Sequence, residues 1–171
     1  MKILAQFTLL CLLSFSVCAQ KWAKGHKYPY KVEAPIGFYE RTPTGANTDI
    51  ALRDEVGNSI VIVVTELPEQ LCGQNSSTTM SEISNQDFVE MAEQSLDRVK
   101  LVKRGTLNVN GESAHFANIT HQSSTGGIEL YAENYYIWHN GYQYLMTLSC
   151  RPENRDVVGA KFYRAVRSLI F

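Results

Sequence analysis

The chain has 171 residues, of which 44% are hydrophobic and 19% are charged. Its 16 basic residues nearly balance its 17 acidic residues, so the net charge is −1. This balance excludes the strongly basic field that nucleic acids and anionic membranes select, and the expected partner is a protein or a small molecule. The length suits one compact domain.

Residues 1–19 combine the early Lys2 with an apolar run and a small-residue end at Val17-Cys18-Ala19. This pattern is typical of a signal peptide cleaved before Gln20, and it predicts an exported protein that is periplasmic or secreted. The apolar run is too short to favour a permanent transmembrane helix. An alternative is lipid attachment at Cys18, which bulky Val17 disfavours.

After the leader, residues 20–30 show no period and predict a flexible arm, followed by a single domain over residues 31–171. The alternation of apolar residues predicts strands at 31–34, 50–53 and 60–67, with a turn at Gly57-Asn58 between the last two. The stretch 68–84 is rich in Gly, Asn, Ser and Thr and predicts a long loop.

A helix is expected to begin at Ser84, with Asp87 as its capping partner. Its apolar stripe repeats at helical spacing and predicts core packing over Phe88, Met91, Ala92, Ser95, Leu96 and Val99. A second helix follows Arg151-Pro152 and ends the chain, with its apolar side at Val158, Phe162, Ala165, Val166 and Leu169. Both helices must pack on a sheet.

Two hairpins are predicted by the turn dipeptides Asn110-Gly111 and Asn140-Gly141. Two-residue turns pair Val109 with Glu112, and His139 with Tyr142. The register then places Tyr131, Tyr135 and Ile137 on a core face. The opposite face carries a mixed set that is either half covered or open to a ligand: Asn134, Tyr136, Trp138, Gln143, Leu145 and Thr147.

Together these elements predict an α+β domain, a mostly antiparallel sheet of about six or seven strands with helices packed on it. Five segments carry a family resemblance: YKVEAPIGFYE, QDFVEMAEQSL, LNVNGESA, NGYQYLMTLSC and KFYRAVRSLIF. They resemble the PsbP-like α/β/α sandwich superfamily over residues 28–171. That group includes photosystem-II extrinsic proteins, Ran-binding Mog-type proteins and exported bacterial proteins. The resemblance implies a docking, assembly or chaperone-like module and carries over no functional residue.

Cysteine usage predicts one disulfide. Cys11 and Cys18 leave with the leader, and the remaining pair, Cys72 and Cys150, would lie in an oxidising compartment. We therefore predict that these two residues are bridged. A reactive thiol or a metal-binding role is the less favoured alternative, because no base or clustered Cys/His spacing accompanies either residue.

The sequence has no phosphate loop, no nucleophile elbow and no metal-ligand spacing, so no cofactor and no metal are predicted. His115 and His121 lie about 20 Å apart on one strand face. Together with His139 and with Glu129 or Glu133, they define the alternative hypothesis of a small metal-dependent or acid/base hydrolase. The predicted register puts Glu133 opposite Leu148 on the core face, where the carboxylate must find a partner.

Aromatic residues gather in the second hairpin, and Tyr136 and Trp138 on the mixed face are the best candidates for partner contact. Asn75 and Asn118 match the glycosylation pattern, which matters only in a glycosylating host. The sequence thus predicts an exported, non-catalytic binding or assembly module of the cell envelope or secreted space. It would contact a protein or small ligand through an aromatic sheet face and loops.

Overall fold

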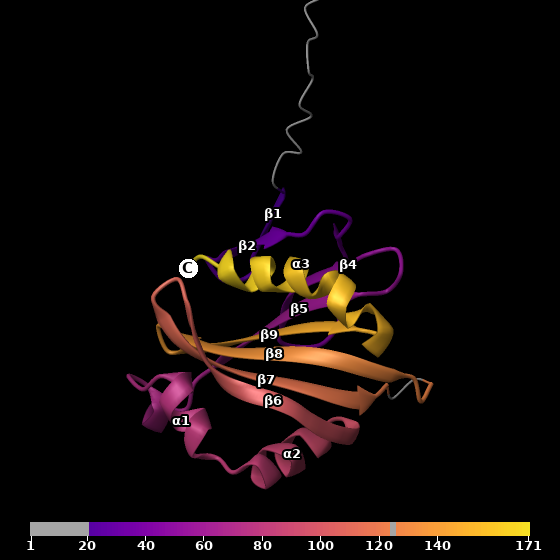
Figure 1. Ribbon diagram of the computed structural model, residues 1–171. Helices are drawn as coiled ribbons and strands as arrows, with labels where there is room; N and C mark the ends of the chain where they lie inside the picture. The colour runs from indigo at the N-terminus through magenta and orange to yellow at the C-terminus, as the bar shows by residue number, and fades with distance from the viewer. Residues whose placement is uncertain (1–20, 124–125) are drawn as a thin grey trace, which may run out of the picture.

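The computed structural model describes residues 21–123 and 126–171, so the predicted leader lies outside the described residues. The described residues form three layers (Figure 1). A seven-stranded sheet lies in the middle, with α3 (Arg155–Arg167) and a two-stranded sheet on one side. Two short helices, α1 (Ser76–Glu82) and α2 (Asn85–Glu93), lie on the other side. We call the two sides of the main sheet the α3 face and the α2 face.

The main sheet has the strand order β3-β4-β5-β9-β8-β7-β6, and every neighbouring pair is antiparallel. This confirms the predicted α+β class with a mostly antiparallel sheet. Two 3-10 turns, Glu69–Leu71 and Pro152–Asn154, precede α1 and α3. The strands are β1 (Lys21–Lys24), β2 (Lys31–Ala34), β3 (Tyr39–Glu40), β4 (Thr48–Arg53), β5 (Ser59–Glu66), β6 (Asp97–Val109), β7 (Glu112–Gln122), β8 (Glu129–His139) and β9 (Tyr142–Cys150).

Both predicted hairpin registers are confirmed. Val109 pairs with Glu112 across the β6–β7 turn, and His139 pairs with Tyr142 across the β8–β9 turn. Asn110 and Asn140 each have φ of 48°, the left-handed value that a two-residue turn requires and that Asn tolerates. The turn dipeptides therefore fix which side chains share a face in both hairpins, in β6 only as far as the register shift between Leu101 and Lys103.

The main hydrophobic core lies between the α3 face and α3. Phe162 of α3 is fully buried and packs edge-on against Phe38, with ring centroids 6.3 Å apart. Strands β4, β5 and β9 supply the facing aliphatic side chains, all at most 2% exposed: Ile50, Leu52, Ile60, Ile62, Val64, Met146 and Leu148. The predicted apolar side of the last helix is thus the side that is buried.

Residues 21–30 differ from the expected flexible arm. β1 pairs with β2 from Lys21↔Ala34 to Lys24↔Lys31, and both Ala23 and Tyr30 are buried in the main core. A four-residue strand is too short to show a period in the sequence, so the pairing becomes visible only when the partner strand is known.

The predicted loop over residues 68–84 is wrong in its second half, which forms α1. Asn75 caps this helix by accepting a hydrogen bond from the Thr78 amide at 2.9 Å. The helix sequence SSTTMSE is poor in strong helix formers, so propensity gives no signal for it. The next helix, α2, begins after Ser84 as predicted, but it ends at Glu93, and Val99 belongs to β6.

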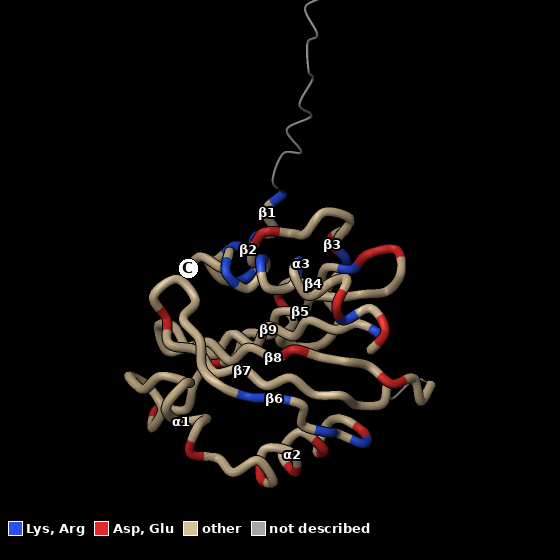
Figure 2. Tube along the Cα trace, in the orientation of Figure 1, with Lys and Arg blue, Asp and Glu red and all other residues tan. Residues whose placement is uncertain are grey.

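Charged residues lie mainly on loops, helices and the edge strand β6, whereas β9 carries none (Figure 2). In the part of the chain that the structure describes, no helix is both long and apolar enough to span a bilayer.

Candidate functional site

Part of the mixed face predicted from the sequence forms the floor of a groove on the α2 face. A cavity of about 550 Å³ lies between this face and α2. β5, β9, β8 and β7 supply the floor, and α2 supplies one wall. We call this cavity the α2 groove. Its lining consists of Ser59, Val61, Phe88, Met91, Ala92, Ser95, Leu96, Ile119, His121, Leu130, Ala132, Asn134, Tyr136, Leu145, Thr147 and Ser149.

Helix α2 is positioned by its cap and by one aromatic anchor. The Ser84 hydroxyl accepts from the Asp87 amide at 3.1 Å and donates to the Asp87 carboxylate at 2.8 Å. One turn in, Phe88 is 1% exposed, and its ring meets Tyr136 edge-on with centroids 6.3 Å apart. The cap therefore sets where the helix begins, and Phe88 holds it over β8.

Arg104 of β6 holds the junction between α1 and α2. Its guanidinium donates to the carbonyls of Met80 and Ser84, the latter at 3.2 Å, and stacks 5.3 Å from the Phe88 ring centroid. Met80 lies in the last turn of α1, where a carbonyl lacks a partner inside the helix, so a cationic donor satisfies it well. Arg104 thus connects the edge of the sheet to the wall of the groove.

Helix α1 is attached to the sheet through hydroxyl groups. Ser76 donates to the backbone carbonyls of Ser113 and Tyr136, and Ser77 shares a 2.6 Å hydrogen bond with the Ser113 hydroxyl. Ser76 and Ser77 are both buried. These contacts explain why a helix of weak intrinsic propensity forms here.

The lining of the α2 groove contains no Asp, Glu, Lys or Arg side chain. Its polar groups are hydroxyls, one amide and His121. Asn134, 8% exposed, accepts a 2.9 Å hydrogen bond from Thr147 and donates to the Ala117 carbonyl at 3.4 Å. A neutral wall of aliphatic and hydroxyl groups suits a ligand that is mostly apolar and uncharged.

His115 lies deeper under this face. It is 1% exposed, and within residues 21–123 and 126–171 neither of its ring nitrogens has a hydrogen-bond partner. Its ring lies 6.4 Å from that of Tyr136. Burial, and then the nearby Arg104 charge, lowers the pKa of His115 to about 4. A neutral imidazole therefore packs beneath α1 and α2 at physiological pH.

The two predicted contact residues, Tyr136 and Trp138, have different environments in the structure. Tyr136 lines the α2 groove, and burial raises the pKa of its hydroxyl to about 12. Trp138 does not line it. Its side chain is 6% exposed, and its indole N–H donates to Gln143 at 3.1 Å. The expected partner contact at Trp138 would therefore require the side chain to leave its packed position.

The residues of the alternative hydrolase hypothesis do not converge. His115 and His121 lie on the α2 face, whereas Glu133 and His139 lie on the α3 face, because their positions on the strands alternate. Among the described residues no three His, Cys, Asp or Glu side chains are close enough to hold a metal ion. Glu133 pairs with Leu148 as predicted, and it meets its need for partners through two tyrosine hydroxyls.

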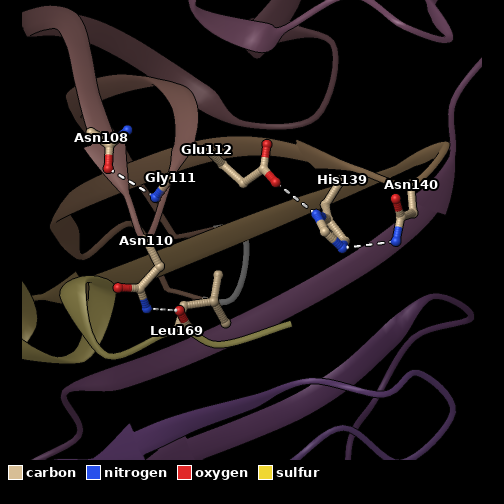
Figure 3. Close-up of polar contacts among 7 residues, drawn as sticks. All are labelled: Asn108, Asn110, Gly111, Glu112, His139, Asn140 and Leu169. Atoms are coloured by element: carbon tan, nitrogen blue, oxygen red, sulfur yellow. Dashed lines mark hydrogen bonds and ion pairs between the residues drawn. The ribbon is translucent and has the colours of Figure 1, made fainter.

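His139 lies between the two hairpin turns and contacts a residue at each of them (Figure 3). Its Nδ1 lies 2.7 Å from a carboxylate oxygen of Glu112, its Nε2 lies 2.9 Å from the Asn140 amide nitrogen, and its ring stacks on Phe171 at 4.2 Å. In the other turn, the Asn110 amide donates to the Leu169 carbonyl. These contacts join both turns to the C-terminal segment.

The predicted disulfide does not form in this structure, because Cys72, which follows the 3-10 turn Glu69–Leu71, lies near the start of β9 and Cys150 is the last residue of that strand. Cys72 Sγ is 4.0 Å from the Leu67 carbonyl, and the Leu67 amide donates to Gly141 in the β8–β9 turn. Cys150 ends β9. The strand from Tyr142 to Cys150 spans about 27 Å at a rise of ~3.4 Å per residue. A bridge needs Cα atoms within about 7 Å. Both cysteines are free thiols, Cys72 exposed and Cys150 buried.

Sequence reasoning missed Arg104 and Ser76, the residues that attach the two helices to the sheet. A basic residue in a strand next to a predicted hairpin usually faces solvent, and a serine in a polar stretch gives no packing signal. The Ser84–Asp87 spacing was the one usable signal, and it located the start of the groove wall.

No protein-family model and no curated protein matches the chain. Several solved structures are similar to it. Cyanobacterial PsbP (CyanoP) from Synechocystis has 14% identity and a TM-score of 0.66 over 92% of this chain and 95% of its own. LpqN, involved in cell envelope biogenesis of Mycobacterium tuberculosis, has 7% identity and a TM-score of 0.59, covering 88% of both chains.

The Ran-binding protein Mog1p from Saccharomyces cerevisiae has 8% identity and a TM-score of 0.56 over 88% of this chain and 94% of its own. At such low identities, structural similarity shows the fold alone. The fold of these proteins agrees with the three layers described above. The chain has the PsbP-like α/β/α sandwich fold.

Proposed function

We propose that this protein is an exported, non-catalytic binding module that holds a neutral, mostly apolar small ligand in the α2 groove. The observation that carries the proposal is a cavity of about 550 Å³ whose lining contains no Asp, Glu, Lys or Arg side chain. This volume lies within the range of about 300–1,000 Å³ that small-molecule sites occupy. Proteins usually dock on flatter patches of about 800 Å² per partner, so the concave shape favours a small ligand over a protein.

Export is supported by the leader-like composition of residues 1–19. The similar protein LpqN takes part in cell envelope biogenesis, which agrees with an extracytoplasmic binding role. The similar protein Mog1p binds Ran, and docking of a protein partner on the α2 face is therefore an outcome that the experiment below must distinguish.

The test uses the full chain expressed in an exporting host, with its N-terminus read first. We expect cleavage before Gln20. The purified protein is then titrated with N-phenyl-1-naphthylamine, a neutral apolar fluorophore. Wild type should bind it saturably, and Val61→Glu should weaken binding at least tenfold, because the variant places a charge on the groove floor.

The matched control is Val63→Glu. Val63 lies two residues further along β5 on the same face, is also partly exposed, and does not line the groove. It should bind the fluorophore as wild type does, with both variants folded by circular dichroism. Equal loss in both variants, or no saturable binding by wild type, would contradict the groove as the binding site and favour a protein partner.

A further inference from the structure

A second site lies on the opposite side of the sheet and is independent of the α2 groove. Glu133 sits near the middle of β8 on the α3 face, opposite Leu148 of β9, the strand that carries no charged residue (Figure 2). Its carboxylate accepts hydrogen bonds from Tyr131 at 3.3 Å and from Tyr135 at 2.8 Å. The Asn118 amide donates to the Tyr131 hydroxyl at 2.7 Å, which orients that hydroxyl toward Glu133.

The two tyrosines keep the carboxylate in one orientation. Tyr131 and Tyr135 are 5% and 7% exposed. Burial, followed by the Glu133 charge, raises the pKa of Tyr131 to about 12, and the same causes raise the pKa of Tyr135 further. Both hydroxyls therefore remain donors at neutral pH. Each carboxylate oxygen uses one lone pair for a tyrosine and keeps a second one for a ligand.

A cavity of about 300 Å³ opens at this carboxylate, between the sheet and α3. Its walls include Phe116, Tyr135 and Tyr163, the last of which is 60% exposed on α3. Gly159 leaves room on the same helix, since no atom lies within 4 Å of the position a Cβ would take. The result is a small aromatic pocket with a fixed carboxylate, which we call the Glu133 pocket.

Within the described residues, no basic side chain forms an ion pair with Glu133 within 4 Å. Arg155 stacks on Tyr131 at 5.5 Å. The basic residue that lines the pocket, Lys103, instead places its ammonium 5.6 Å from the Phe116 ring centroid. The aromatic wall thus already holds an alkyl cation from the same chain. A carboxylate beside an aromatic face selects a cation.

We propose that the Glu133 pocket binds the guanidinium group of a ligand, which displaces the Lys103 ammonium from Phe116 and pairs with Glu133. A guanidinium is preferred to an ammonium for two reasons. It is planar, so it stacks on an aromatic ring, and its paired N–H groups match the two free lone pairs of the carboxylate. Lys103 then acts as an internal competitor. The ligand is either a free guanidine compound or an arginine side chain of a peptide.

The experiment is a calorimetric titration with agmatine and with a short blocked peptide that contains one central arginine. The same peptide with citrulline, the neutral planar isostere, is the ligand control. Wild type should bind the cations and not the citrulline peptide. Glu133→Gln should weaken binding by about 10- to 100-fold, because it removes a charge-assisted hydrogen-bonded pair. Lys103→Met should tighten binding by about three- to fivefold, because it removes the competing cation.

The protein control is Glu129→Gln, which removes an exposed carboxylate from the same strand and should leave binding unchanged. The Lys103→Met prediction does not depend on whether Glu133→Gln folds. Equal binding of the citrulline peptide, equal loss in Glu129→Gln, or weaker binding by Lys103→Met would each overturn the proposal. Stronger binding of agmatine than of the peptide identifies a free small ligand, and the reverse order identifies an arginine side chain. In either case, fluorophore binding in the α2 groove is expected to stay the same.

Discussion

Adjacent residues of β5 have different environments on the two faces of the main sheet. Ile60 and Ile62 point to the α3 face and are fully buried, whereas Val61 and Val63 point to the α2 face and are partly exposed. The α3 face is covered by α3 and by the β1–β2 pair, which complete one continuous core. On the α2 face, the short helices pack mainly on β6, β7 and β8.

The two faces contribute unequally to the stability of the fold. The α3 face carries most of the buried apolar surface, and the free energy of folding follows that surface. The α2 face contributes a smaller cluster around Phe88, Ile119 and Ala132, and its remaining area forms the groove. Most of the stability therefore comes from the α3 face, and the proposed groove for an apolar ligand lies on the α2 face.

The largest expected effect is the loss of stability when a buried aromatic side chain is truncated, and we expect this loss to differ between the two faces. Phe162→Ala on the α3 face should lower the free energy of unfolding by about 3–5 kcal/mol, because the enclosed core cannot collapse into the space left behind. Phe88→Ala on the α2 face should cost about 1–2 kcal/mol less, because α2 can settle and the groove admits water. Urea denaturation of both variants measures the difference. Equal losses would contradict the proposed division between the faces.

A smaller effect concerns pH and the buried imidazole of the α2 face. The pKa of His115 is lowered to about 4, against 6.5 in an unfolded chain, so the unfolded state binds the proton more readily. The contribution of this group is complete above pH 6.5 and is lost as the pH falls toward 4. Between pH 7.5 and pH 4.5, wild type should lose about 2–3 kcal/mol more stability than His115→Leu.

Denaturation of both proteins at the two pH values isolates this effect, because the carboxylates that also titrate there are common to both. Parallel losses would mean that His115 takes up a proton in the folded state without cost. NMR titration of the imidazole in the native protein provides an independent measurement of the same pKa.

The fold was largely predictable because its strongest signals are local. Two Asn-Gly turns and alternation predicted the registers of both hairpins next to their turns, including the pairing of Glu133 with Leu148, but not the two register shifts in β6. The last helix followed from its periodic apolar side. In contrast, α1 depends on hydroxyl contacts between Ser76, Ser77 and residues far along the chain, and no local pattern encodes such contacts.

The candidate sites were predictable only in part. Alternation identified the mixed face, but it did not distinguish Tyr136, which lines the groove, from Trp138, which is buried. The number of cysteines predicted a bridge, but a count carries no information on distance, and in the fold Cys72 lies near the start of β9 whereas Cys150 ends it. The hydrogen-bond partners of Glu133, Tyr131 and Tyr135, lie two residues away on the same strand. The alternation of side chains along a strand places all three on one face, so these partners could have been predicted from the sequence.

The smallest expected effect tests whether the groove wall is held independently of the main core. Arg104→Met keeps the aliphatic contact with Phe88 but removes the bonds to the Met80 and Ser84 carbonyls. Because Arg104 is only partly buried, we expect a loss of about 1–2 kcal/mol. Hydrogen exchange should accelerate in α1 and α2 while α3 remains protected. Lys100→Met, an exposed change in the same strand, is the control. Faster exchange in α3 as well would mean that the two faces unfold as one cooperative unit.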